Sequence, residues 1–262
     1  MNPAVMLREV KIEGIRRENR EHGHDVVALE VPLTVVVNQF EVATLLCSPG
    51  NFWELALGYL LSEGIITWEA RLDGITQNPV SGVVRVMVPE RFVSLDGNRQ
   101  GRLVGSGCAN SIPVYRGADA LGPGLVDSDY HVPAGLVLQA MKSFEKAGTT
   151  FRKSGGTHAC ALDAANGAAC FFEDIGRHNA LDRIVGRCFL EGIDASSSMV
   201  LTTGRISSEI VFKAARLGAP LIVSRSAPTT LSLEAAGYLG VTVVGFARGS
   251  RMNCYTHPWR VV

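Results

Sequence analysis

The last quarter of the chain alternates strand-like and helix-like segments, and this alternation constrains the fold more than any other feature. Runs of apolar and β-branched residues at 199–203, 221–223 and 241–246 are typical of strands, whereas 207–217 and 230–239 between them have helical patterns. Strands joined by helical crossovers pair in parallel, because a right-handed crossover returns the chain to the same end of the sheet. The sequence therefore predicts an α/β domain with helices on the faces of its sheet.

Residues 158–173 are predicted to add a β-hairpin to this domain. Two short β runs flank Asn166-Gly167, a dipeptide that favours the tight turn of a two-residue hairpin. Counting outward from this turn places Cys160 opposite Glu173.

One further helix is predicted before this hairpin, and another between the hairpin and the alternating segments. One has Pro133 in its first turn, where the missing N–H costs nothing, and runs to Ala147. The other follows Asp174 and ends near Gly192, since glycine is common just after a helix.

The first part of the chain mixes strands and a helix without the regular alternation. Residues 25–46 suggest two strands interrupted by Pro32, and residues 79–104 suggest more strands. A helix is expected after Asn51, with Asn51 and Glu54 as a capping pair. This pattern predicts a smaller α+β N-terminal domain.

A turn-rich stretch at 117–133 is typical of a domain boundary. We therefore divide the chain into residues 1–120 and 121–262.

Charge and hydropathy exclude several classes of protein. The 25 Lys and Arg residues balance the 25 Asp and Glu residues, so no overall positive field favours nucleic acid. The chain has no uncharged apolar run of 18 residues, and its charged N-terminus does not resemble a signal peptide. We expect a cytoplasmic protein that binds neither nucleic acid nor membrane.

Each strand of the alternating unit is followed by a loop that contains arginine. Because ligands of parallel sheets bind beyond the carboxyl ends of the strands, these loops are expected to meet at one edge. Arginines, small hydroxyls and glycines beside helix N-termini are suited to a diphosphate. A single such loop is more often a solvated surface with a serine N-cap, but three in register favour a nucleotide-like ligand. The loops are Gly204-Arg205, Ser224-Arg225-Ser226 and Arg248-Gly249-Ser250-Arg251.

Two histidines lie near glycines at predicted element starts, His158 before a strand and His178 before a helix. No further ligands stand at metal-site spacing, so a structural or ligand-orienting role is favoured over metal binding. A hydrogen bond from His178 to Asp182, four residues later, is the simplest structural alternative. Zinc deaminase chemistry is disfavoured, because Cys160 stands where that motif needs glutamate.

Cys108 differs from the other cysteines because it lies in a Gly/Ser-rich loop, residues 105–111, with arginines nearby in sequence. Positive neighbours and solvent access raise the thiolate fraction that a sulfur-carrying cysteine needs. An incidental loop cysteine remains the alternative. The other five cysteines, Cys47, Cys160, Cys170, Cys188 and Cys254, are expected to lie in core elements.

Taken together, several segments resemble the FdhD/NarQ family in their order along the chain. The most specific is the run from Glu173 to Asp182, with its acidic pair followed by Gly-Arg-His-Asn. The other matching segments are Asn38, Pro49, Glu54–Leu60, Ser62–Ile66, Gly155–Ala159, Gly204-Arg205, Ser208-Glu209, Ser224–Thr229, Gly245–Gly249, Asn253 and Tyr255-Thr256.

The resemblance implies a fold and a function. It implies a cytidine-deaminase-like three-layer α/β/α C-terminal domain with a mixed sheet, in a homodimer. It implies that the protein moves persulfide sulfur from a cysteine desulfurase to the molybdenum bis(molybdopterin guanine dinucleotide) cofactor needed by formate dehydrogenase. GDP or GTP would then be partial mimics of that cofactor.

The resemblance also implies site residues. The persulfide cysteine of the family corresponds to Cys108. Its usual C-x-x-C pattern is incomplete here, because Ser111 occupies the second cysteine position. The cofactor-binding segment corresponds to Phe246, Ala247, Arg248, Gly249, Ser250 and Arg251. The strand-end loops add Arg205, Ser224 and Arg225, and the ligand-orienting role considered for the histidines adds His178.

Two other functions remain as alternatives. A non-enzymatic chaperone would bind the molybdenum cofactor and deliver it to an apo-oxidoreductase without carrying sulfur. A nucleotide hydrolase is disfavoured, because the chain lacks a Walker P-loop.

Overall fold

The computed structural model describes residues 6–17, 19–78, 80–94, 102–104, 126–164 and 167–262. A six-stranded mixed sheet, in the order β13-β12-β11-β10-β8-β9, forms the centre of the C-terminal part. β10, β11 and β12 are parallel, as the alternating sequence pattern predicts, whereas β8, β9 and β13 run antiparallel to their neighbours. The strands are β8 (His158–Ala164), β9 (Gly167–Asp174), β10 (Ser198–Thr202), β11 (Leu221–Ser224), β12 (Thr242–Arg248) and β13 (Arg251–Cys254).

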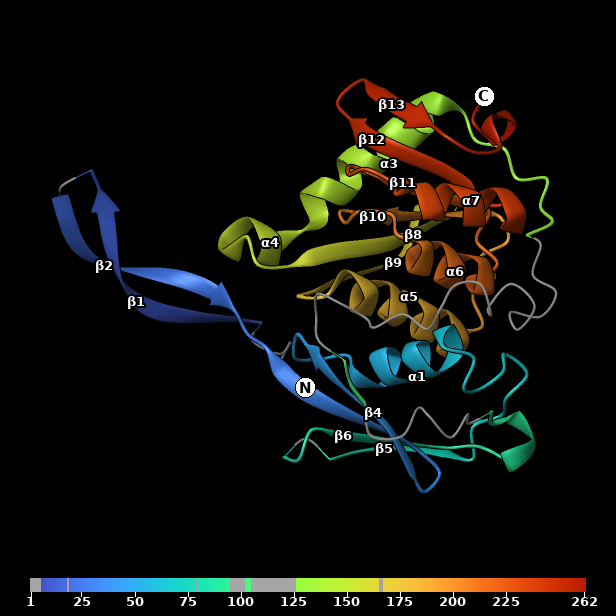
Figure 1. Ribbon diagram of the computed structural model, residues 1–262, viewed down its shortest axis with the longest axis horizontal. Helices are drawn as coiled ribbons and strands as arrows, with labels where there is room; N and C mark the ends of the chain where they lie inside the picture. Colours follow the sequence, from blue (N-terminus) through green and yellow to red (C-terminus); the bar gives the residue numbers. More distant parts are fainter. Residues whose placement is uncertain (1–5, 18, 79, 95–101, 105–125, 165–166) are drawn as a thin grey trace.

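Helices cover both faces of this sheet (Figure 1). One face packs against α3, where Val137, Met141 and Phe144 meet Ala159 and Ala161 of β8. The opposite face packs against α5, α6 and α7, so these layers form an α/β/α arrangement. The likeness to cytidine deaminases stays an expectation. The helices are α3 (Ala134–Ala147), α4 (Thr149–Ser154), α5 (Arg177–Glu191), α6 (Ser208–Leu217) and α7 (Thr230–Leu239).

Two helix boundaries refine the sequence predictions. Pro133 is the N-cap of α3 and precedes its first turn. α5 ends at Gly192, as predicted, with this glycine in the left-handed conformation at φ 65°.

A second sheet lies below the helices in Figure 1, in the order β5-β6-β3-β4-β7. Pro32 lies inside β3, so the predicted break between strands is wrong. β6 pairs with β3 only from Thr34 onward, and Pro32 therefore leaves no ladder bond to β6 unmade. The elements are β3 (Val31–Val37), β4 (Phe40–Cys47), α1 (Phe52–Ser62), β5 (Gly74–Asn78), β6 (Val83–Met87), the 3-10 turn η1 (Glu90–Phe92) and β7 (Arg102–Val104).

The predicted capping pair of α1 does not form. Asn51 is the N-cap, but it adopts a left-handed conformation at φ 49° and its side chain makes no capping bond. Glu54 instead pairs with Arg187 of α5 at 2.6 Å. The partner on another helix could not be read from local sequence.

Helices α1 and α5 pack so closely that two glycines are required where they cross. A side chain at Gly58 would collide with the carbonyl of Asp182, and one at Gly186 would collide with the carbonyl of Glu54. The buried core is consequently continuous from the five-stranded sheet through these helices to the six-stranded sheet. The two parts proposed from the sequence thus share one core, and the proposed boundary at 120–121 lies outside the described residues.

A long β-hairpin at the N-terminus was not predicted. Among the described strands, β1 (Leu7–Arg16) and β2 (Asn19–Ala28) pair only with each other, and they extend away from the body of the molecule (Figure 1). The strand predicted from residue 25 onward overlaps only the end of β2. The residues before it are rich in charged and polar side chains and lack clear hydrophobic alternation, so they gave no strand signal.

Within the part of the chain that the structure describes, no helix has the length and apolar character needed to cross a membrane.

Candidate functional site

The loops after β10, β11 and β12 meet at one edge of the six-stranded sheet. The Ser224 hydroxyl donates a hydrogen bond to the Gly204 carbonyl at 2.6 Å, which joins the first two loops. Arg248 Nε donates to the Arg225 carbonyl at 2.7 Å, which joins the second and third. The predicted convergence of strand ends is therefore present, and we call residues 203–208, 224–229 and 246–251 the strand-end edge.

The predicted cofactor residues differ in exposure. Ser224 and Ala247 are buried, whereas Phe246 and Arg225 are half-buried. Arg225 also lies 3.7 Å from Glu145 of α3. The remaining residues of the predicted set at this edge are exposed: Arg205, Arg248, Gly249, Ser250 and Arg251.

The end of β12 is bent. Phe246 has a left-handed backbone at φ 52°, which a bulky side chain rarely adopts, and the strand register shifts between Gly245 and Arg248. The Phe246 N–H donates to the Ser226 carbonyl at 3.0 Å, and the Arg248 guanidinium lies 6.0 Å from the Phe246 ring. Strained backbone of this kind is frequent at binding sites.

His178 lies in the first turn of α5 and faces the start of α6. Its Nε2 atom is 3.0 Å from a Glu209 carboxylate oxygen and 3.4 Å from the Ser207 hydroxyl. The predicted bond to Asp182 is wrong, because the Asp182 carboxylate binds Lys213 at 2.7 and 2.8 Å. A partner on α6 fixes His178 at the strand-end edge. The Ser208-Glu209 segment was the only sequence signal for it.

A cluster of positive groups surrounds His158. Burial is the main cause that lowers the pKa of His158, and the charges of Arg177, His178 and Arg205 lower it further. Its Nδ1 atom is 3.5 Å from the Thr203 hydroxyl. His158 and His178 are therefore neighbours, as the sequence allowed, and the N-termini of α5 and α6 add to the positive potential. The arrangement favours an anion.

Arg177 is a site residue that the sequence analysis missed. Its aliphatic part packs against Gly204, where an added Cβ would lie 3.1 Å from Arg177 Cβ. Its Nε atom is buried and makes no hydrogen bond to any described residue. Buried donors are normally paired, so the absence of a described partner sets Arg177 Nε apart from most buried donors. Its place in the Gly-Arg-His run was the available signal.

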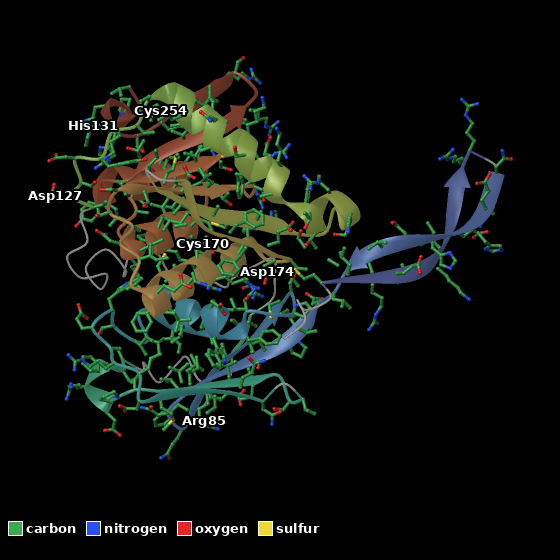
Figure 2. The ribbon with its side chains drawn as sticks, turned by 180° about the vertical axis from the view of Figure 1, so that it is seen from behind. Arg85, Asp127, His131, Cys170, Asp174 and Cys254 are labelled. Carbon is green, nitrogen blue, oxygen red and sulfur yellow. The ribbon has the colours of Figure 1, made fainter. Side chains whose placement is uncertain are left out.

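Asp174, in the same segment from Glu173 to Asp182, has a structural role. Asp174 and Arg183 are fully buried and pair at 2.6 Å (Asp174 is labelled in Figure 2). Arg183 also donates to the carbonyls of Ser48, Gly50 and Asn51, and Asp174 accepts from the Ser48 and Gly176 N–H groups. This buried pair fixes the loop before α1 against the start of α5.

Glu173 has a different structural role at the same edge. Its carboxylate accepts hydrogen bonds from the N–H groups of Thr149, Thr150 and Phe151, at 2.8–3.1 Å, and so caps α4. The acidic pair of the motif thus positions the site without entering it.

The predicted persulfide residue Cys108 lies outside the described residues, as does Ser111. Among the described cysteines, Cys47 and Cys160 are buried, and burial raises the pKa of Cys47 to about 12 and that of Cys160 still further. Cys254 is exposed, so the expectation of a core position is wrong for it (Figure 2).

Two other findings concern the cysteines of the hairpin. Cys160 faces Phe172 and not Glu173, because the hairpin closes at Ala164 and Gly167, one position before an Asn166-Gly167 turn would close it. That closure alone would place Cys160 opposite Phe171, and the register shift between Leu162 and Asp163 moves it to Phe172. Cys170 is half-buried, and a hydrogen bond from the Cys188 thiol lowers its pKa.

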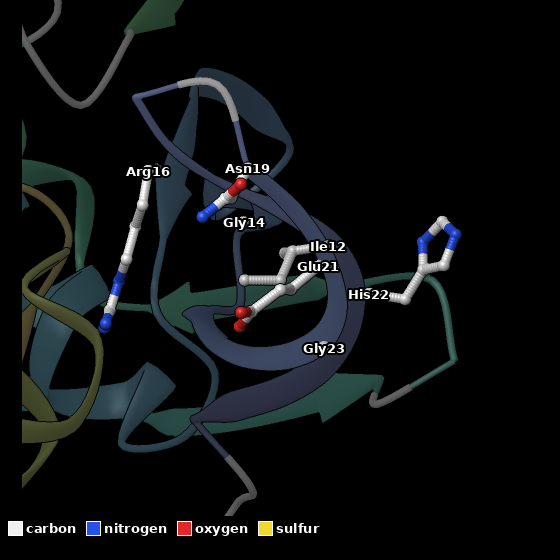
Figure 3. Close-up of a pocket in the computed structure, with 7 residues that line it drawn as sticks. All are labelled: Ile12, Gly14, Arg16, Asn19, Glu21, His22 and Gly23. Carbon is white, nitrogen blue, oxygen red and sulfur yellow. The ribbon is translucent and has the colours of Figure 1, made fainter.

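Two observations concern sites of other kinds among the described residues. No group of three or more metal-binding side chains occurs among them. A hollow of about 190 Å³ lies on the N-terminal hairpin, away from the strand-end edge (Figure 3). It is lined by Ile12, Gly14, Arg16, Asn19, Glu21, His22 and Gly23 and contains no predicted site residue.

Comparison with known proteins gives a consistent result. The model of the FdhD/NarQ family matches residues 28–262. Sulfur carrier protein FdhD of Geobacillus kaustophilus is 37% identical over 238 residues, which cover 91% of this chain and 90% of that protein. The protein of the same name from Bacillus pumilus is 37% identical over 263 residues, covering 100% of this chain and 99% of its own.

A solved structure is similar as well. The crystal structure of a candidate formate dehydrogenase accessory protein from Desulfotalea psychrophila has a TM-score of 0.79 and 25% identity. The match covers 98% of this chain and 100% of that one.

Proposed function

The chain belongs to the FdhD/NarQ family, and from this premise we propose that it carries sulfur, as a persulfide on Cys108, from a cysteine desulfurase to a molybdenum cofactor. The names of the relatives support the carriage of sulfur, and the similar solved structure supports formate dehydrogenase as the client. The proposed cargo acceptor is the bis(molybdopterin guanine dinucleotide) cofactor.

The chemistry proposed for Cys108 begins with attack of its thiolate on the outer sulfur of the desulfurase persulfide. The bond between the two donor sulfurs breaks, the donor cysteine leaves as a thiolate, and Cys108 holds the transferred sulfur. Release of that sulfur as sulfide takes two electrons, which two cellular thiol groups supply as they join in a disulfide, and Cys108 returns to the thiol.

The strand-end edge is the proposed binding surface for the cofactor. The main support for this binding surface is that the loops of Arg205, Arg225 and Arg248 meet there, beside the N-termini of α5 and α6. Guanidinium groups and helix N-termini both bind phosphate oxygens, so the edge is suited to a guanine dinucleotide. His178, held by Glu209, and Arg177, whose Nε has no hydrogen-bond partner among the described residues, would orient the bound anion.

The binding surface is tested with half of the dinucleotide. GDP and GTP are expected to bind without turnover, and Arg205→Ala and Arg248→Ala are each expected to weaken binding about tenfold, because each removes a charge-assisted contact of about 1–3 kcal/mol. Isothermal titration calorimetry measures the affinities. The matched control is Arg91→Ala in η1, whose guanidinium lies over Phe92 away from the edge.

Two outcomes would contradict this part of the proposal. Wild-type affinity in both edge variants would remove the strand-end site. Release of phosphate from GTP would instead support the nucleotide hydrolase.

The serine at position 111 leads to a prediction about how long the persulfide on Cys108 persists. In a C-x-x-C loop, the second thiolate can attack the persulfide, expel sulfide and leave a disulfide, whereas a serine hydroxyl cannot. The persulfide on Cys108 is therefore expected to persist longer in the natural protein than in Ser111→Cys. Mass spectrometry after removal of the sulfur donor measures its decay.

The exposed Cys254 requires a control, since its thiol could also discharge the persulfide. The comparison is therefore repeated in a Cys254→Ser background. Equal decay with Ser and with Cys at position 111 would count against the proposed discharge route.

A further inference from the structure

Two cysteines from different elements meet between the sheet and helix α5. Cys170 is on β9, the outermost strand of the six-stranded sheet, and faces Leu162 of β8. Cys188 is on α5, and both cysteines belong to the core that this helix forms with the sheet. The Cys188 thiol donates a hydrogen bond to the Cys170 sulfur. Neither thiol has a part in the proposed sulfur transfer or in the strand-end edge.

The two thiols differ in their access to solvent. Cys188 is 1% exposed, whereas Cys170 is half-buried on the edge strand (Cys170 is labelled in Figure 2). A small oxidant can therefore reach Cys170 first, with Cys188 directly behind it. This order is typical of a reactive cysteine that stands next to a resolving cysteine.

The surroundings of Cys170 favour its thiolate. The hydrogen bond from Cys188 is the main cause that lowers the pKa of Cys170, against the effect of burial. The positive charge of Arg187 lowers the pKa further. The Arg187 guanidinium lies 5.5 Å from the ring of Phe172, two residues after Cys170 on the same face of β9. The thiolate is the form of cysteine that reacts with oxidants.

We infer that Cys170 and Cys188 form a reversible disulfide when the protein meets hydrogen peroxide. The Cys170 thiolate attacks one peroxide oxygen, the O–O bond breaks, and hydroxide leaves while Cys170 becomes a sulfenic acid. The Cys188 sulfur then attacks the Cys170 sulfur, and the departing hydroxyl takes the Cys188 proton and leaves as water. The hydroxide from the first step takes up the proton that Cys170 had lost. The two thiols have then given two electrons to the peroxide, which becomes two molecules of water.

Cys160 lies on the same face of the sheet but is a less suitable partner. It faces Phe172, so it lies diagonally across the strands from Cys170. It is 1% exposed, and burial raises its pKa far above the usual range. The hydrogen-bonded sulfurs of Cys170 and Cys188 need only a short approach to form a disulfide, whose bond is about 2.0 Å long. The expected bond is therefore specific to this pair.

Peptide mapping after treatment with hydrogen peroxide tests the pair directly. Cys108→Ser serves as the background, so the result does not depend on the proposed sulfur carriage. Free thiols are blocked with iodoacetamide before digestion. Trypsin cuts between Cys170 and Cys188, and a protease specific for aspartate cuts between Cys160 and Cys170 at Asp163. We expect two peptides linked through Cys170 and Cys188, and dithiothreitol should separate them.

Variants in the same background test the order of the two steps. Cys188→Ala is expected to stop at the sulfenic acid of Cys170, which dimedone traps, because the resolving thiol is gone. Cys170→Ala is expected to give neither sulfenic acid nor disulfide. Cys160→Ala is the matched control, since Cys160 is as buried as Cys188, and it should keep the link.

The link is also expected to raise thermal stability. A bond between positions 170 and 188 restricts the unfolded chain, so the oxidised protein should unfold about 5 °C above the reduced protein, and Cys170→Ala should show no such rise. Differential scanning calorimetry measures both midpoints. A midpoint that falls on oxidation would contradict the inference, because the bond would then form only by displacing α5 from β9. Peroxide-treated protein without the Cys170–Cys188 link, or with Cys170 linked equally to Cys160, would overturn it.

Discussion

Cells whose only copy of this protein carries Cys108→Ser are expected to lose nearly all formate dehydrogenase activity, although the variant accumulates as a folded protein. A serine hydroxyl cannot form the persulfide, so the proposed transfer has no route. The measurement is formate oxidation in extracts, together with the amount of the variant and its thermal unfolding.

The control is a buried cysteine. Cys160 is 1% exposed in the core, so Cys160→Ser places a hydroxyl in apolar surroundings and is expected to lower stability by about 1–3 kcal/mol. Its effect on activity should follow the amount of folded protein. Unchanged formate dehydrogenase activity with Cys108→Ser would contradict the transfer role and favour the chaperone that delivers the cofactor without sulfur.

Asp174→Asn is expected to give the largest loss of stability, about 3–5 kcal/mol, because it leaves the buried charge of Arg183 without its counter-ion. The loop at residues 48–51 would lose part of its attachment to α5 at the same time. Urea unfolding followed by circular dichroism measures the change.

A surface carboxylate provides the matched control for Asp174. Glu191 pairs with Arg187 four residues earlier at 2.6 Å, but its side chain is 49% exposed. Glu191→Gln is therefore expected to change the stability by less than about 0.5 kcal/mol. Similar small losses in both variants would show that the Asp174–Arg183 pair does not hold the loop in place.

The alternating C-terminal elements were predictable from sequence because periodicity and glycine placement agree there. β10, α6, β11, α7 and β12 all occur close to the predicted ranges. The convergence of their loops followed from the rule that parallel strands end at one edge.

Features that depend on distant partners could not be predicted. Arginine is usually a surface residue, yet Arg183 is buried because Asp174 and three carbonyls surround it. Glu209 becomes the partner of His178 only when α5 and α6 pack together.

Local irregularities and unusual surroundings account for the other differences. The hairpin closes at Ala164 and Gly167 and its register shifts between Leu162 and Asp163, and counting outward from Asn166-Gly167 reveals neither feature. Most of the N-terminal hairpin was missed because charged and other polar residues are frequent in both strands and no buried face imposes alternation.

The central claim is that Cys108 carries sulfur, and the most direct test is intact-protein mass spectrometry after incubation with a cysteine desulfurase and cysteine. The account predicts a species heavier by about 32 Da, the mass of one sulfur atom, that disappears on addition of a thiol reductant and is absent in Cys108→Ser. A native protein that gains no sulfur, or a Cys108→Ser variant that gains as much, would contradict it.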